Sequence, residues 1–222
     1  MLKRSLPFLL IALVFAGAVA GGGWFYRERR AQNPPMPRNL ALGKPGARPP
    51  HVHGPTGAPV SIEEFGDYEC LPCAGVFALL KSIEAEYKGR ISLTFRQYPL
   101  KMHQHGMDAA QAAEAAGVQG RFWEMHAAIF EGRAAWTVAG ADVRNFFNGY
   151  AQAAGVDLAQ FARDLTGPTV TGRIAADQER AASVGVDRTP VLFINGRSLP
   201  HTAVTAEGLR AEIEKELRGA KK

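Results

Sequence analysis

Both cysteines of the 222-residue chain lie in one turn, at positions 70 and 73 of the stretch YECLPCAGVFALL. Two thiols this close can form a small disulfide ring, bind a metal ion, or remain as small core side chains. The thiolate is the reactive form of cysteine, and the N-terminus of a helix stabilises it through the helix dipole and free backbone N–H groups. The chemistry of the pair therefore depends on whether Cys70 begins a helix.

Four histidines could add ligands to the cysteine pair. His103 and His105 follow the second predicted strand, and His51 and His53 precede the first. Cysteine and histidine are the usual ligands of zinc, so a metal-binding protein is an alternative from another class. We expect no metal and no cofactor, because loop histidines are more often solvated. One of His103 and His105 could instead stabilise the Cys70 thiolate from outside the turn.

Alternating polar and apolar residues predict two strands around the cysteine turn. The first is PVSIEEFGDY, which precedes Cys70, and the second is ISLTFRQYPL, residues 91–100. A helix is expected between them, from Cys70 to Tyr87. Parallel strands joined by a helix end at one edge of a sheet. Cys70 should therefore lie at a helix N-terminus on that edge, as the low-pKa, exposed nucleophile, with Cys73 buried one turn further in.

The second half of the chain predicts a helical block and then a hairpin. Four or five helical segments lie in an insertion at about residues 103–185, before an apolar strand, PVLFING. Asn195-Gly196 favours a tight turn into a short return strand, and a closing helix capped by Thr205 follows. The element order predicts an α/β protein with a thioredoxin-like fold, a βαβ unit and a ββα unit with an inserted helical subdomain.

The N-terminus carries an export signal. Lys3 and Arg4 precede an uncharged, largely apolar stretch, residues 5–26, which is long enough to span a bilayer. The residues AVA within it also fit a signal-peptidase site. We expect residues 1–26 to be a membrane anchor or a cleaved signal, and the remaining chain to be periplasmic, on the extracytoplasmic side of a bacterial inner membrane.

Composition changes again after this stretch. Residues 27–57 are rich in proline and glycine with little apolar periodicity, which predicts an extended linker. The folded domain is then expected to cover residues 58–220. The formal net charge of +5 is mild, and no basic run is interleaved with aromatic residues, so nucleic-acid binding has little support.

Two motifs resemble the signatures of the DsbA-like thioredoxin family. VSIEEFGDYECLPC is similar to its strand followed by C-x-x-C, and VGVDRTPVLFINGR to its cis-proline turn and following strand. YPLKMHQHGMDAAQAAEAA also resembles family members. The resemblance covers roughly Pro59 to Leu217 and implies an extracytoplasmic thiol–disulfide oxidoreductase. Its substrates would be the thiols and disulfides of exported proteins, and its redox partner would be membrane-embedded.

The resemblance also implies roles for single residues. Pro190 matches the cis-proline of the family, which would hold Thr189 beside the disulfide. Glu64 matches the buried acidic position, where a carboxyl with a raised pKa could relay the proton of the resolving cysteine, Cys73. Because Glu63 is adjacent, a change of strand register would exchange the two carboxyl groups.

One departure from the family concerns the direction of the reaction. The best-known oxidants of the family have a histidine inside C-x-x-C, whereas this chain has Leu71-Pro72. Leucine and proline cannot assist the thiolate as histidine does, and proline before the second cysteine is also typical of reducing thioredoxins. We expect disulfide donation to exported proteins, with a reductase or isomerase of the same fold as the alternative and a non-enzymatic binding module as another.

Overall fold

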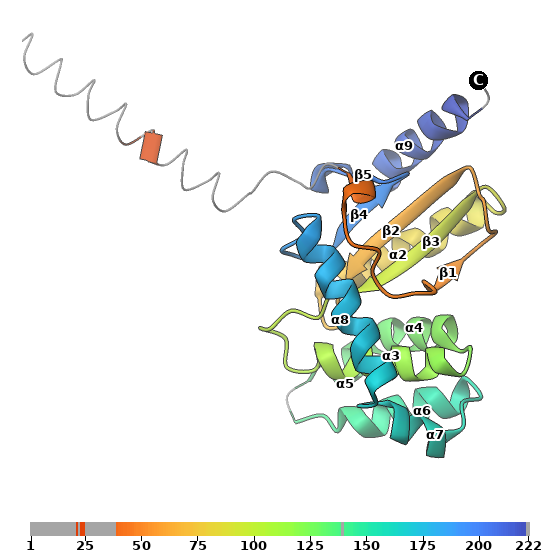
Figure 1. The fold of residues 1–222 in the computed structure, drawn as a ribbon, viewed down its shortest axis with the longest axis vertical. Coiled ribbons are helices and arrows are strands. Elements are labelled where there is room, and N and C mark those ends of the chain that lie inside the picture. The colour runs from red at the N-terminus through yellow and green to blue at the C-terminus, as the bar shows by residue number, and fades with distance from the viewer. Residues whose placement is uncertain (1–20, 22, 25–38, 139, 221–222) are drawn as a thin grey trace, which may run out of the picture. The chain divides into compact units, whose positions relative to one another are not determined.

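The computed structural model of the chain describes residues 21, 23–24, 39–138 and 140–220 (Figure 1). The predicted anchor or signal, residues 5–26, therefore falls almost entirely outside the described residues. Within the described part of the chain, no helix combines the length and the apolar character that a bilayer span requires.

A mixed five-stranded sheet organises the domain, with the strand order β1-β3-β2-β4-β5 (Figure 1). The central strand β2 (Val60–Gly66) pairs in parallel with β3 (Ile91–Gln97) and antiparallel with β4 (Val191–Ile194). Short strands form the two edges, β1 (Val52–His53) and β5 (Arg197–Ser198). Because β2 and β3 are parallel, both carry their carboxyl ends to the same edge.

The alternation predicted for β2 is correct. Val60, Ile62 and Glu64 are buried, whereas Ser61 is exposed and Glu63 is partly buried. Two helices contribute to the core that contains Val60 and Ile62, α2 (Leu71–Glu86) and α9 (Ala206–Gly219). The strand therefore has an apolar face with a single carboxyl group, and that group lies near the end of the strand that leads to Cys70.

Helices fill the segment between β3 and β4, and Figure 1 shows most of them as a bundle at one end of the sheet. They are α3 (Gly106–Val118), α4 (Phe122–Glu131), α5 (Arg133–Trp136), α6 (Val143–Ala153), α7 (Leu158–Asp164) and α8 (Pro168–Ser183). The alanines of α3 are buried in the core of this bundle, because small side chains allow neighbouring helices to approach closely. α8 then returns towards β4 and contacts β3.

The predicted start of the folded domain near Ala58 is wrong, because residues 39–57 pack against the domain. Leu40, in the short helix η1 (Leu40–Leu42), and Ala47 are buried, and β1 adds an edge strand to β3. The backbone of Ala47 donates to Asp177 Oδ1 (2.8 Å) and accepts from Arg96 (3.0 Å). We call residues 39–57 the strap. The strap has no stripe of apolar side chains. Hydrogen bonds between its backbone and distant charged side chains attach it to the domain instead.

The hairpin and the closing helix agree with the sequence. Asn195 (φ 46°) and Gly196 (φ 76°) both have the positive φ angles that a tight two-residue turn requires. After the short helix η2 (His201–Ala203), the side chain of Thr205 caps α9 by accepting a hydrogen bond from Gly208 N (3.0 Å). These local signals fix β4, which borders the cysteine turn.

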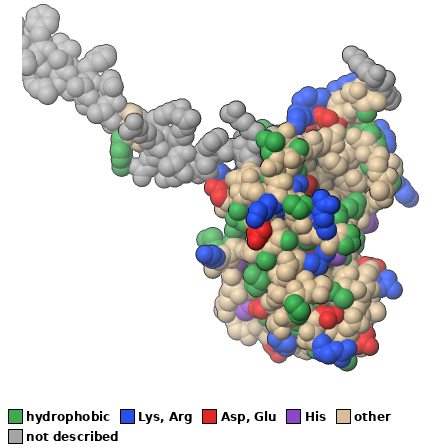
Figure 2. All heavy atoms as spheres, in the orientation of Figure 1, with side chains coloured by type: hydrophobic (Ala, Val, Ile, Leu, Met, Phe, Trp, Pro, Cys, Tyr) green, Lys and Arg blue, Asp and Glu red, His purple; other side chains and the backbone are tan. Residues whose placement is uncertain are grey.

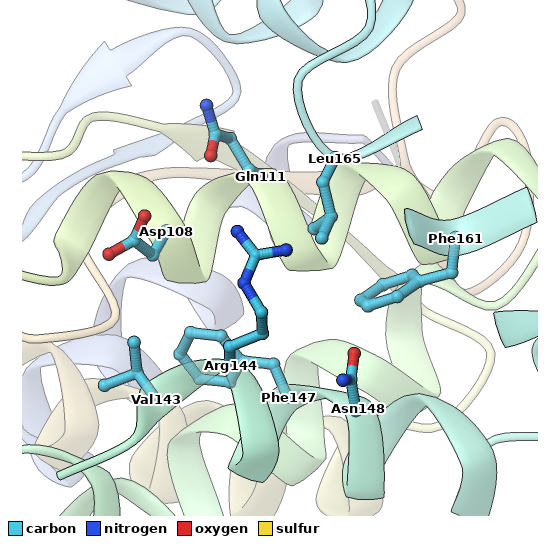
Figure 3. A pocket seen from close by; sticks show the side chains of 8 residues that line it. All are labelled: Asp108, Gln111, Val143, Arg144, Phe147, Asn148, Phe161 and Leu165. Atoms are coloured by element: carbon cyan, nitrogen blue, oxygen red, sulfur yellow. The ribbon is translucent and has the colours of Figure 1, made fainter. Parts of the chain in front are cut away.

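The surface gives little further indication of a site. Acidic and basic side chains are interspersed on the face shown in Figure 2. A pocket of about 120 Å³ lies among α3, α6 and α7, with Arg144 above an apolar floor that includes Phe147 and Phe161 (Figure 3). None of the predicted site residues lines this pocket. The chemistry suggested by the sequence therefore has to be sought at the edge of the sheet.

Candidate active site

The two cysteines occupy the first turn of α2, as the spacing predicted. Cys70 is the N-cap residue: its backbone N–H donates to Asp67 O (3.2 Å), and its carbonyl accepts from Ala74 N (3.2 Å). Pro72 also lies in this turn, where its missing N–H costs no helical hydrogen bond. The Cys70 sulfur therefore lies at the positive end of a 16-residue helix.

Both thiols are free, and both are buried. Cys73 is fully buried, as expected, but Cys70 is only 5% exposed. The prediction of an exposed Cys70 is therefore wrong for this reduced form. The cause is the loop before β4, because the carbonyl oxygen of Thr189 lies 3.7 Å from Cys70 Sγ and covers it.

The surroundings separate the acidities of the two thiols. A hydrogen bond from the Cys73 side chain, together with bonds from Thr189 and the Cys73 backbone, lowers the pKa of Cys70 to about 6, against the opposing effects of burial and of the Asp67 charge. Burial, and then the hydrogen bond to Cys70, raise the pKa of Cys73 far above its ordinary value. At neutral pH the pair therefore carries one negative charge on Cys70 and one proton on Cys73.

The loop that covers Cys70 contains the predicted Thr189-Pro190 pair. Their peptide bond is cis, as the sequence motif suggested. The Thr189 hydroxyl is buried and has no hydrogen-bond partner of ordinary geometry, but it lies close enough to Cys70 to favour the thiolate. The structure thus brings the cysteine pair, Cys70 and Cys73, together with Thr189 and Pro190, which lie far from the pair in the sequence.

Glu64, and not Glu63, is the carboxyl near the thiols. Glu64 is 2% exposed, its Oε1 has no hydrogen-bond partner, and burial, with a contribution from the Cys70 charge, raises its pKa to about 8. Glu63 accepts hydrogen bonds from Arg96 and Arg180 at 2.7 Å. Although burial opposes ionisation, these arginines hold the pKa of Glu63 below its ordinary value.

Asp67 is a site residue that the sequence analysis missed. It follows β2 directly, and its buried carboxylate accepts hydrogen bonds from Glu69 N (2.8 Å) and Leu100 N (2.7 Å). His103 Nδ1 lies 2.7 Å from the same carboxylate. An aspartate at a strand end, two residues before the N–H that it accepts, is a recognised turn-forming signal, and it could have identified Asp67.

The histidines of the metal alternative are not gathered at the cysteines. His51 contacts Glu114 (2.9 Å), His53 contacts Glu84 (2.7 Å) and His105 contacts Asp108 (3.4 Å). The described residues contain no cluster of three or more histidine, cysteine, aspartate or glutamate side chains that could hold a metal ion. The geometry therefore gives the metal alternative no support.

Comparison with known proteins agrees with this geometry. The model of a family described as Thioredoxin matches residues 47–215. A thioredoxin-like oxidoreductase from Silicibacter pomeroyi is similar, with 25% identity and a TM-score of 0.64 over 76% of this chain and 92% of that chain. The alpha-DsbA1 of Wolbachia pipientis shares the fold, with 19% identity and a TM-score of 0.68 over 82% and 97% of the two chains.

A curated relative is a longer protein. The Na(+)/H(+) antiporter NhaA 1 of Mycolicibacterium gilvum is 35% identical over 196 residues, which are 85% of this chain but 30% of the relative. The chain thus spans less than a third of the relative that it matches. The family match, in contrast, covers most of the chain, from the strap to α9. The chain therefore belongs to the thioredoxin family and has the fold of the DsbA-like thiol–disulfide oxidoreductases.

Proposed function

We propose that the chain donates disulfide bonds to exported proteins through Cys70 and Cys73. The observation that carries this proposal is the division of acidity within the pair. Cys70, at the N-terminus of α2, has a pKa of about 6, whereas the neighbouring Cys73 keeps its proton. A stabilised Cys70 thiolate is a good leaving group, so the disulfide form of the pair is readily reduced by substrate thiols.

The reaction proceeds in two exchange steps. A substrate thiolate attacks Cys70 Sγ in the Cys70–Cys73 disulfide; the bond between the two cysteines breaks, and Cys73 departs with the electron pair and takes up a proton. A second substrate thiolate attacks the substrate sulfur of the mixed disulfide, and Cys70 leaves as the thiolate. The substrate loses two electrons and the cysteine pair gains them. A disulfide on a partner protein must then reoxidise the pair.

We propose that Glu64 donates the proton that Cys73 takes up when the disulfide is reduced. With a pKa of about 8, the Glu64 carboxyl is largely protonated at neutral pH and can donate as the Cys73 thiolate forms. A cavity of about 180 Å³ borders Glu64 between α2 and α4, with Phe77 and Trp123 in its wall. Such a volume accommodates water, which can return a proton to the carboxyl after each cycle.

The direction of the reaction rests on the compartment and on the thiolate. The apolar N-terminal stretch suggests export to a compartment where disulfides persist. A Cys70 pKa of about 6 lies between the values of about 7 for thioredoxin and about 3.5 for DsbA. We therefore propose a donor of moderate oxidising strength, held at the membrane by residues 5–26 and reoxidised by a membrane-embedded partner. The longer antiporter relative does not lead us to propose transport for this chain.

Trapping the redox state in cells tests the direction. Acid quenching followed by thiol alkylation should find the Cys70–Cys73 pair mostly as the disulfide. The oxidised protein should also introduce disulfides into a reduced, unfolded substrate, while Cys70→Ser should not. A predominantly dithiol pool in cells would overturn donation in favour of the reductase alternative.

A further inference from the structure

Asp67 connects the cysteine turn to the loop that follows β3. Its Oδ1 accepts a hydrogen bond from Glu69 N (2.8 Å) and its Oδ2 accepts one from Leu100 N (2.7 Å). Its backbone carbonyl accepts from Cys70 N (3.2 Å). The carboxylate is fully buried, so water screens its charge poorly. One side chain thus fixes the turn and places a charge three residues from the reactive sulfur.

Two groups face this carboxylate. His103 Nδ1 lies 2.7 Å from Asp67 Oδ2, and the imidazole is 22% exposed. The first turn of α3 is the second group, because Gly106 brings the N-terminus of that helix against the carboxylate. A Cβ at Gly106 would lie 2.8 Å from Asp67 Oδ1 and 3.0 Å from Oδ2, so a larger residue could not be placed there without displacement. A helix N-terminus and an imidazole in contact with it stabilise this buried negative charge.

We infer that the Asp67–His103 pair adjusts the stability of the Cys70 thiolate, with His103 as a positioning residue that acts through Asp67. A carboxylate close to a thiolate destabilises it by like-charge repulsion, and a hydrogen-bond donor to the carboxylate draws its negative charge away from the thiolate. The hydrogen bonds from Cys73 lower the pKa of Cys70, and the charge of Asp67 raises it. His103 therefore reduces the repulsion between the Asp67 carboxylate and the Cys70 thiolate.

The other ionisable groups around the turn do not take this role. His105 has its Nδ1 3.4 Å from Asp108, and its backbone N–H donates to the Glu69 carboxylate (2.5 Å). Arg133 Nε donates to the Glu69 carbonyl oxygen (3.0 Å). Glu64 interacts electrostatically with both thiols, and its charge raises the pKa of Cys73 after the effects of burial and of the Cys70 hydrogen bond. The hypothesis that a histidine assists Cys70 from outside the turn is thereby narrowed to His103.

The inference rests on thiol–disulfide exchange at Cys70, and variants of the full chain test it. In His103→Ala the Cys70 pKa should rise by about 0.5 unit, and the equilibrium with glutathione should shift about threefold towards the Cys70–Cys73 disulfide. His103→Gln, which can keep a hydrogen-bond donor to Asp67, should show a smaller shift in the Cys70 pKa than His103→Ala. His105→Ala is the matched control and should leave both quantities unchanged. A protein with no exchange at all in its parent form would contradict the proposed function instead.

A double-mutant cycle separates this role from a structural one. Asp67→Asn should lower the Cys70 pKa, and in that background His103→Ala should produce no further shift. Melting temperatures of all variants report any loss of structure, and if Asp67→Asn does not fold, the comparison of His103→Ala with His103→Gln still decides. The inference is overturned if His103→Ala lowers the melting temperature without moving the pKa or the glutathione equilibrium. Equal shifts in the two Asp67 backgrounds overturn it as well.

Discussion

Two adjacent carboxyl groups on β2 have opposite environments. Glu63 faces the strap side of the sheet, where Arg96 and Arg180 bind it and keep its pKa low despite burial. Glu64 faces the thiols, has an unpartnered oxygen, and has a pKa raised to about 8 by burial. The same residue type thus holds the structure together on one face of the strand and is suited to proton transfer on the other.

The difference shows how a strand with period two can separate stability from chemistry. Successive side chains point to opposite faces, so each carboxyl group meets a different set of neighbours. The arginines stabilise the ionised form of Glu63, while the apolar surroundings of Glu64 favour its neutral form. Substitutions on the two faces should therefore have separable effects.

The largest effect is expected at the thiols on the Glu64 face. Cys73→Ser removes the group that resolves a mixed disulfide, so turnover should be lost and covalent complexes with substrate proteins should accumulate on Cys70. Non-reducing electrophoresis and mass spectrometry detect these complexes. Cys70→Ser is the control and should form none. Turnover by Cys73→Ser at the parent rate would show that the resolving role belongs elsewhere.

On the opposite face, Glu63→Gln should destabilise the fold by about 3 kcal/mol, because buried Arg180 loses its carboxylate and buried Arg96 keeps only that of Asp177. Urea unfolding measures the loss, and the glutathione equilibrium should not change. The stabilisation by Glu63 is present above its unfolded pKa of 4.5 and is lost as the pH falls through its lower folded pKa. A change in the redox equilibrium without a change in stability would reverse the assignment of the two faces.

Glu64→Gln should act in the opposite direction. Because the pKa of Glu64 is raised on folding from 4.5 to about 8, its stability contribution is full below pH 4.5 and declines as the pH rises towards 8. The glutamine variant should therefore be more stable than the parent at pH 9, by up to about 5 kcal/mol, with little difference at pH 4. Unfolding curves at the two pH values check this, and equal differences at both would contradict a neutral buried carboxyl.

The sequence predicted those features that have local causes. Alternation along β2, proline in the first turn of a helix, and Asn195-Gly196 all act through neighbouring residues. The cis bond before Pro190 and the choice of Glu64 over Glu63 followed from the family resemblance and from the strand period. Each of these predictions needed few residues and no long-range contact.

The features that were missed depend on contacts between distant segments. The strap is attached by hydrogen bonds of the Ala47 backbone with Arg96 and Asp177. Nothing in the sequence around either side chain indicates this partner. Cys70 is covered by Thr189, which is 119 positions away. The distinction between His103 and His105 depends on which imidazole reaches Asp67. The partners of these charged and polar side chains depend on the three-dimensional fold, which the local sequence does not specify.

The pH dependence of alkylation at each cysteine tests the central claim most directly. Reduced protein is treated with iodoacetamide over a range of pH, and peptide mapping assigns the modified residue. The account predicts modification of Cys70 with a midpoint near pH 6, with Cys73 protected until the protein unfolds. A midpoint near the ordinary cysteine value of about 8.5, or first modification at Cys73, would contradict it.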